Sequence, residues 1–112
     1  MTSFCGAASL LASSGSLPAA PLTAQHDQQT DVIRVIRQDD PQPLLTQHVR
    51  PQFRPYLHPI VAPDGTGVLT QDSPGHHRHQ TGVYWGFTRV NGRDFFHHPG
   101  SKYWRKVSAH VV

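Results

Sequence analysis

Proline is the residue that most limits how this chain can fold. The segment from residue 50 to 63, RPQFRPYLHPIVAP, contains four prolines. Proline has no backbone N–H and clashes with the preceding turn of a helix, so this density excludes a helix interior and a central strand, and it permits extended segments at a sheet edge. No window of the sequence shows convincing helical periodicity. The chain is therefore predicted to be all-β.

Short runs of β-branched and aromatic residues, separated by turn signals, define the expected strands. The runs are DVIRVIR (31–37), LLTQHV (44–49), the proline-rich segment (50–63), TGVYWGFTRV (81–90), FFHH (95–98) and KYWRKVSAHVV (102–112). The expected turns are DDPQP (39–43), DGTG (64–67) and NGRD (91–94). The predicted architecture is an antiparallel meander. Its last strand ends in apolar residues and leaves an open sheet edge, which predicts self-association.

Residues 1–30 are predicted to form a disordered leader, and residues 31–112 a single β domain. The leader is dominated by Ala, Ser, Gln, Thr and Pro, a composition that cannot offset the entropy of ordering the backbone. Its short apolar stretch and the small residues that end at Ala24 weakly resemble a signal peptide, although Lys and Arg are missing from its start. Export to the periplasm and a cytoplasmic location remain alternatives.

The ionisable residues restrict the partners that the chain can have. Ten Lys and Arg residues stand against seven acidic residues, all of them Asp, for a formal net charge of +3. Because the basic residues are spread singly, without a clustered face, a nucleic-acid partner is not expected. No run approaches the roughly 18 apolar residues of a membrane span. Nine histidines predict that solubility and ligand binding depend on pH below about 6.5.

Five histidines carry the first candidate site. Three of them lie in the sequence HHRHQ (76–80), and two follow the NGRD turn. In a strand His77 and His79 share one face, and the turn brings the later pair back toward them. The candidate ligands of a divalent metal, zinc or copper, are His77, His79, His97 and His98. Asp72 and Asp94 are the nearby carboxylates, and a metal-free loop is the alternative.

Aromatic residues near these polar groups suggest carbohydrate recognition as a second interpretation. Sugar sites combine an aromatic platform with side chains that hydrogen-bond hydroxyl groups, and the candidate aromatics are Tyr84, Trp85, Phe87 and Trp104. The alternative is core packing, because alternation places Val83, Trp85 and Phe87 on one face of their strand. For Trp85 and Phe87 the core is the favoured assignment.

A row of polar residues alternates along the proline-rich segment. Arg54, Tyr56 and His58 share one side of an extended chain. They are expected either to form the wall of a site, with Arg54 as a fixed cation, or to be a solvated edge protected by proline.

Five motifs in order resemble the start of the PmoA-like family, bacterial proteins of uncharacterised function labelled methane oxygenase. The motifs are RPYxHP from Arg54, PDG from Pro63, HHRHQ from His76, YWG from Tyr84 and VNGxDF from Val90. The resemblance implies a β-sandwich of the galactose-mutarotase type, related to sugar-processing enzymes, of which this chain is the N-terminal part. It also implies mutarotase-like chemistry with His77 or His79 as general acid. The carboxylate base would come from farther along the chain.

The resulting functional hypothesis is a carbohydrate-related protein that uses histidine in acid–base chemistry. The catalytic candidates are His77 and His79, and the substrate-binding candidates are Arg54, Tyr56, His58, His76, Arg78 and Gln80. A noncatalytic sugar- or metal-binding β module is the alternative, because a hydrolase or epimerase needs a carboxylate opposite the histidines. A link to methane oxidation, as the family label says, ranks third.

Overall fold

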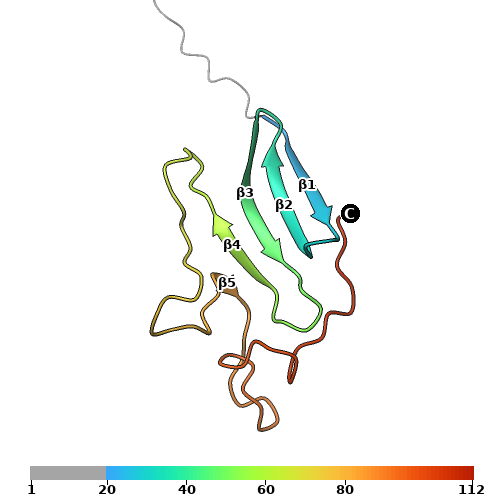
Figure 1. The fold of residues 1–112 in the computed structure, drawn as a ribbon, viewed down its shortest axis with the longest axis vertical. Helices are drawn as coiled ribbons and strands as arrows, with labels where there is room; N and C mark the ends of the chain where they lie inside the picture. Colours follow the sequence, from blue (N-terminus) through green and yellow to red (C-terminus); the bar gives the residue numbers. More distant parts are fainter. Residues whose placement is uncertain (1–19) are drawn as a thin grey trace, which may run out of the picture.

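The computed structural model describes residues 20–112, which form one open antiparallel sheet (Figure 1). The strands are β1 (Leu22–Asp27), β2 (Val32–Arg37), β3 (Asp40–His48), β4 (Tyr56–Ile60) and β5 (Val83–Tyr84). They lie side by side in chain order, and each pairs antiparallel with the next. The all-β prediction and the antiparallel meander are confirmed. No helix occurs within the described range.

The first hairpin is closed by a local carboxylate. Asp27 Oδ1 accepts hydrogen bonds from the backbone N–H groups of Gln29 (3.0 Å) and Thr30 (3.2 Å), which fixes the turn into β2. This hairpin includes β1, although Leu22–Asp27 fell within the predicted leader. The leader prediction is corrected there, because pairing with the β-branched residues of β2 orders this segment. The rest of the predicted leader, residues 1–19, lies outside the described residues.

Prolines enter the sheet where its pairing is irregular. β3 starts earlier than expected, at Asp40, and the predicted turn shrinks to residues 38–39. Pro43 lies beside a register shift between β2 and β3, and Pro59 of β4 lies opposite another in β3. At a bulge one residue is left without a ladder hydrogen bond, so proline can be accommodated there. This allows β4 to be an inner strand and not the edge segment that was predicted.

The second half of the chain forms fewer strands than its aromatic content suggested. Of TGVYWGFTRV only Val83–Tyr84 forms a strand, and neither 95–98 nor 102–112 does. The Asp94 carboxylate caps the backbone N–H groups of Phe96 and His97 (3.0 Å each), so these groups need no ladder partner. The predicted turns at 64–67 and 91–94 are present, and the second is closed by the Val90–Arg93 bridge.

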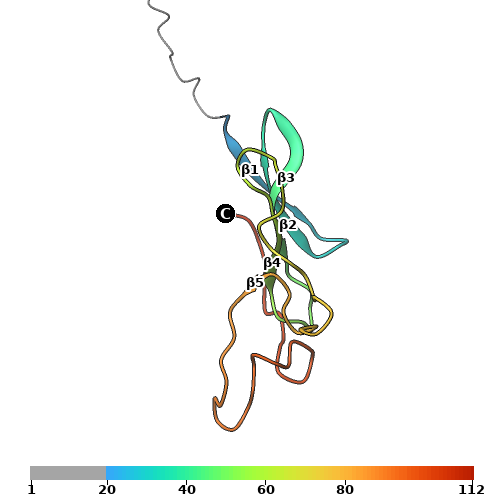
Figure 2. The same ribbon diagram turned by 90° about the vertical axis from the view of Figure 1, so that its left-hand side faces the viewer.

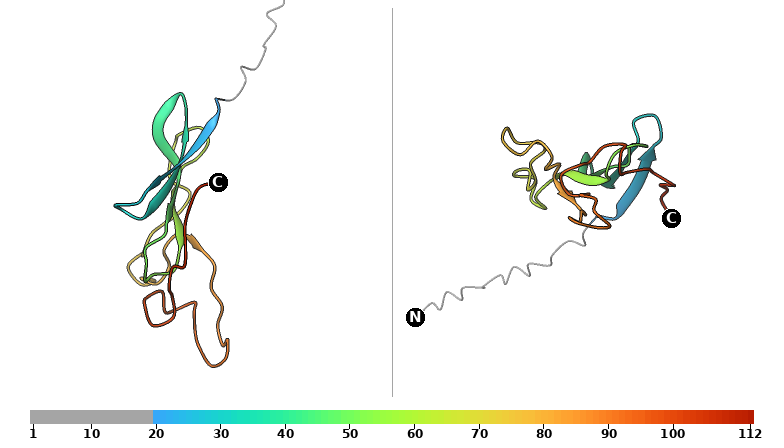
Figure 3. Two further views of the ribbon diagram at one scale, coloured as in Figure 1. Left: turned by 90° about the vertical axis from the view of Figure 1, so that its right-hand side faces the viewer. Right: turned by 90° about the horizontal axis from the view of Figure 1, so that it is seen from below.

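Figures 2 and 3 show the sheet edge-on, with the loops after β5 projecting beyond its end. The C-terminal segment then runs back beside the sheet. Its return is fixed by Lys106, whose N–H donates to the Pro51 carbonyl (2.8 Å) and whose ammonium pairs with Asp31.

The buried core is small. Val32, Val49 and Tyr56 are its buried apolar side chains, and Thr46, Arg54 and Thr81 are buried polar ones. Several large apolar residues are exposed instead, among them Leu69, Val83, Trp85 and Phe87. Trp85 and Phe87 were predicted to be core, and that assignment is wrong, because their segment leaves the sheet after Tyr84. No part of residues 20–112 forms a helix with the length and hydropathy to span a bilayer.

Candidate functional site

Arg54 is the most buried side chain of the described structure and holds the loops to the sheet. Its side chain has no exposed surface, and its two terminal nitrogens donate to the carbonyls of His79 and Phe96, both at 2.6 Å. Its guanidinium carbon lies 3.3 Å from the centre of the Tyr84 ring. Burial lowers the pKa of Arg54, with Tyr84 opposing the effect. We call this arrangement the Arg54 clamp.

The polar row on the proline-rich segment was predicted to be either a solvated edge or the wall of a site, and the structure corrects the first of these expectations. Tyr56 is also buried, and its ring stacks on His48 with centroids 4.3 Å apart. Burial raises the pKa of the Tyr56 hydroxyl. His58 turns its Nδ1 to the Thr70 hydroxyl, 2.8 Å away. The row is therefore not a solvated edge: Arg54 is bonded inside the protein, and Tyr56 lines a hollow described below.

Four histidine rings form a chain above the Arg54 clamp, which we call the histidine cluster. Ring centroids are 4.3 Å apart for His76 and His77, 5.8 Å for His77 and His79, and 4.8 Å for His79 and His97. His98 lies apart, with its ring against Tyr103. The predicted four-histidine metal set is therefore not assembled. Within residues 20–112 no three His, Cys, Asp or Glu side chains converge in a way that could hold a metal ion.

One carboxylate orients the cluster. Asp94 Oδ2 lies 2.7 Å from His97 Nδ1, while its Oδ1 accepts hydrogen bonds from the backbone N–H groups of Phe96 and His97. The backbone N–H of His97, and then its side chain, lower the pKa of Asp94. Partial burial lowers the pKa of His79, and the neighbouring His97 and His77 lower it further. At neutral pH a neutral imidazole thus lies beside a histidine held by a carboxylate, an arrangement able to move a proton.

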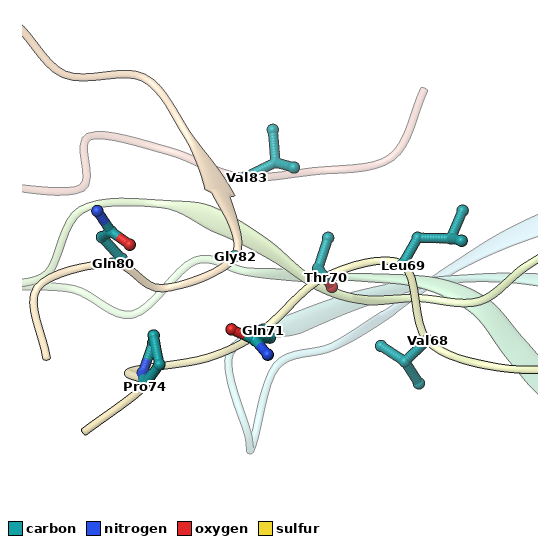
Figure 4. Close-up of a pocket in the computed structure, with 8 residues that line it drawn as sticks. All are labelled: Val68, Leu69, Thr70, Gln71, Pro74, Gln80, Gly82 and Val83. Carbon is teal, nitrogen blue, oxygen red and sulfur yellow. The ribbon is translucent and has the colours of Figure 1, made fainter. Parts of the chain in front are cut away.

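A groove of about 530 Å³ lies between the loop that follows β4 and the segment that enters β5 (Figure 4). We call it the glutamine groove, and its lining residues are Val68, Leu69, Thr70, Gln71, Pro74, Gln80, Gly82 and Val83. Thr70 is fixed by His58 and by the N–H of Ile60, at 3.2 Å. Of the predicted substrate-binding residues, Gln80 lines this groove. His76 and Arg78 are exposed on the loop before it.

Gly82 lets the start of β5 lie close against β4 at one side of the glutamine groove. Its φ is +75°, and a Cβ there would lie 2.2 Å from the Leu57 carbonyl oxygen. A larger residue would therefore push the start of β5 away from β4.

A second hollow of about 380 Å³ adjoins the first, and Val83 lines both. We call it the aromatic hollow, and its lining residues are Gln47, Pro55, Tyr56, Leu57, Val83, Tyr84 and Trp85. The Trp85 side chain is 75% exposed, and its ring lies 5.8 Å from that of Phe87, which is 55% exposed. Trp104 is not part of this surface, since its indole donates to the His98 carbonyl at 3.1 Å.

Gln80 and Tyr56 were predicted as substrate-binding residues, and Tyr84 and Trp85 were named as candidate aromatics with the core favoured for Trp85. Gln71, Thr70 and Gln47 were not predicted. Amide and hydroxyl residues in loops are common and carry no motif of their own. The strongest signal available was the position of VLTQD between two turn signals, directly before the histidine motif.

Residues 35–111 match the model of a family of unknown function, DUF6807. The chain belongs to the DUF6807 family. The match includes the second half of β2, all later strands, both hollows and the histidine cluster. No curated protein and no solved structure matches this DUF6807 chain. The resemblance to the PmoA-like family is therefore corrected, because the family model that matches is DUF6807, a family of unknown function.

Proposed function

We propose that this DUF6807 domain binds carbohydrate on the surface formed by the aromatic hollow and the glutamine groove. The observation that carries the proposal is Trp85, whose indole is 75% exposed beside a hollow. An indole face left in water is a platform on which the C–H groups of a sugar ring can stack. Trp85 combines this apolar face with a preformed concave surface, as small-molecule sites do.

The polar groups beside this platform suit hydroxyl groups. Gln71 and Gln80 supply carboxamides that donate and accept, and Thr70 is held in place by His58. Because the walls are linked to the sheet through the Arg54 clamp, the geometry is available before a ligand arrives, which reduces the entropy lost on binding.

Acid–base chemistry by the histidine cluster is the second candidate function, favoured by the contact between Asp94 and His97 at 2.7 Å. His77 and His79, the predicted catalytic residues, both belong to the cluster. His79 directly precedes Gln80, so a bound sugar that extends beyond the glutamine groove would approach it. Such a reaction would act on a sugar that is already bound, so it would add catalysis to the binding function.

The direct test measures binding to a panel of soluble oligosaccharides by isothermal titration calorimetry. Trp85→Ala should weaken the best ligand about tenfold or more, and Trp85→Phe, which retains an aromatic face, should lose less. Val107→Ala is the control, because Val107 is 95% exposed and lines neither hollow. The proposal would be overturned if the Trp85→Ala variant bound the best ligand as tightly as the wild type, or if the wild type bound no sugar of the panel.

Sedimentation velocity on the same variants separates a sugar platform from a protein interface. If Trp85→Ala converts a dimer to a monomer and leaves the panel results unchanged, the exposed indole serves self-association, as the open sheet predicts.

A further inference from the structure

We infer that the domain has a further binding site, for a small monocarboxylate with an apolar body. The site is a hollow of about 230 Å³ where the returning C-terminal segment lies beside the sheet (Figures 2 and 3). It shares Gln47 and Pro55 with the aromatic hollow, whereas Trp85 and the glutamine groove lie outside it. We call it the arginine hollow, and its wall includes Ile33, Val49, Arg50, Phe53, Lys106 and Ala109.

Arg50 is the residue that would bind the carboxylate. Its guanidinium carbon lies 4.3 Å from the centre of the Phe53 ring, and its Nη2 donates to the Tyr56 hydroxyl at 3.3 Å. Stacking on the ring orients the planar group, and the hydroxyl takes only one of its N–H donors. No carboxylate of residues 20–112 forms a salt bridge with Arg50. An oriented guanidinium with unused donors is suited to a carboxylate that comes from a ligand.

The charges of the wall favour a ligand with one negative charge. Lys106 also lines the arginine hollow, but its ammonium is already paired with Asp31. His110 is the other ionisable residue of the wall, and it adds a positive charge only when it is protonated. A phosphate monoester carries nearly two negative charges near neutral pH, so it would need a second cation beside Arg50. A carboxylate needs only one.

The rest of the wall suits an apolar body. Val49 is buried, and Ile33, Phe53 and Ala109 are half-buried. A ring or a short alkyl chain placed against them removes apolar surface from water, which stabilises the complex. The volume of about 230 Å³ lies below the range typical of drug-sized ligands, so the ligand is small.

The arginine hollow is held open by contacts of its own. The backbone N–H of Lys106 donates to the Pro51 carbonyl at 2.8 Å, and the side chain of Lys106 reaches Asp31. These two contacts fix the C-terminal segment against the turn after β1 and the segment after β3. A wall that is in place before the ligand arrives reduces the entropy lost on binding.

The test titrates the intact, isotope-labelled chain with sodium benzoate and follows the backbone amide signals by NMR. Benzamide is the uncharged probe of the same shape, and acetate is the carboxylate without the ring. Both should bind about tenfold more weakly than benzoate, or less, since each lacks one of the two recognised parts. The amides of Arg50 and Ala109 should shift with benzoate, whereas those of Gln71 and Gln80 in the glutamine groove should not.

Arg50→Gln should weaken benzoate about tenfold or more and leave benzamide unchanged. Arg50→Lys should lose part of the affinity, because an ammonium keeps the charge without the planar fork. Arg105→Gln is the matched control. It removes the same charge from an exposed residue of the C-terminal segment that does not line the hollow.

Each contrary outcome overturns a stated part of the inference. Equal affinity for benzoate and benzamide, or benzoate binding to Arg50→Gln that matches the wild type, overturns recognition of the anion. Acetate binding as tight as that of benzoate overturns the apolar body, and tighter binding of phenyl phosphate overturns the monocarboxylate class. No saturable binding of any probe overturns the site itself. The carbohydrate function would stand in every case, because it depends on Trp85 and on the sugar panel.

Discussion

Removing the guanidinium of Arg54 is the sharpest test of how the loops are held. Its two terminal nitrogens donate 2.6 Å hydrogen bonds to the carbonyls of His79 and Phe96, which lie on different loops. Arg54→Met keeps an unbranched apolar stem in the same space but supplies no donor. Both carbonyls then lose their charged partner inside the protein.

The magnitude follows from these contacts. Two hydrogen bonds from a charged donor contribute about 1.5–3 kcal/mol each, or about 3–6 kcal/mol together. Removing the buried charge returns part of its desolvation cost, so a net loss of about 2–4 kcal/mol is expected. Arg54→Lys should lose at least as much as Arg54→Met, because one ammonium retains a buried charge and cannot match the planar fork that spans both carbonyls.

Urea unfolding followed by tryptophan fluorescence and circular dichroism measures these differences. With a slope near 1 kcal/mol per molar urea, typical of a small domain, the midpoint should fall by about 2 M or more. Arg78→Met is the control, since Arg78 is exposed on the neighbouring loop and should change stability by less than about 0.5 kcal/mol. If Arg54→Lys unfolds at the same midpoint as the wild type, the reasoning about the Arg54 clamp is refuted.

Three further predictions concern single positions. Gly82→Ala should destabilise the domain by about 1–3 kcal/mol in urea, because its φ is +75° and its Cβ would meet a carbonyl oxygen at 2.2 Å, whereas Gly67→Ala, with open space around it, should not. The lowered pKa of His79 means that the unfolded chain binds its proton first, so stability should fall as pH drops below about 6.5. In His79→Gln the urea midpoints at pH 7.5 and 5.5 should lie closer together, and an unchanged gap would contradict this. Asp94→Ala should speed amide hydrogen exchange at His97, and unchanged exchange would show that the cap is unimportant.

Local patterns were sufficient for the first part of the sheet. The β-branched run of β2 and the strand LLTQHV pair as expected, and the turn at Asn91-Gly92 forms where both residues adopt positive φ values of 50° and 73°. These features depend on neighbours in sequence, which a pattern can describe. The strand predicted for 102–112 failed because a strand requires a partner edge, and no local pattern supplies one.

Less of the candidate site could be predicted from the sequence. Histidine clustering was foreseen for His77, His79 and His97, but His98 lies apart against Tyr103. Arg54 was predicted to be a site residue, although in the structure it is buried and holds two loops through their carbonyls. Burial of an arginine can be decided only by what surrounds it, since the same side chain is favourable in water and in a ring of carbonyls.

By itself the sequence determined the class of structure, because proline density and the absence of helical periodicity leave an antiparallel sheet as the main way to satisfy the backbone. The tertiary structure decided which aromatic residues face water and which polar residues are buried. Trp85 is exposed and Arg54 is not, the reverse of what their chemistry alone suggests. The reason is that burial depends on contacts between segments distant in the chain. Those contacts leave Trp85 beside an open hollow, while the loop at His79 and the loop at 96–99 close around Arg54.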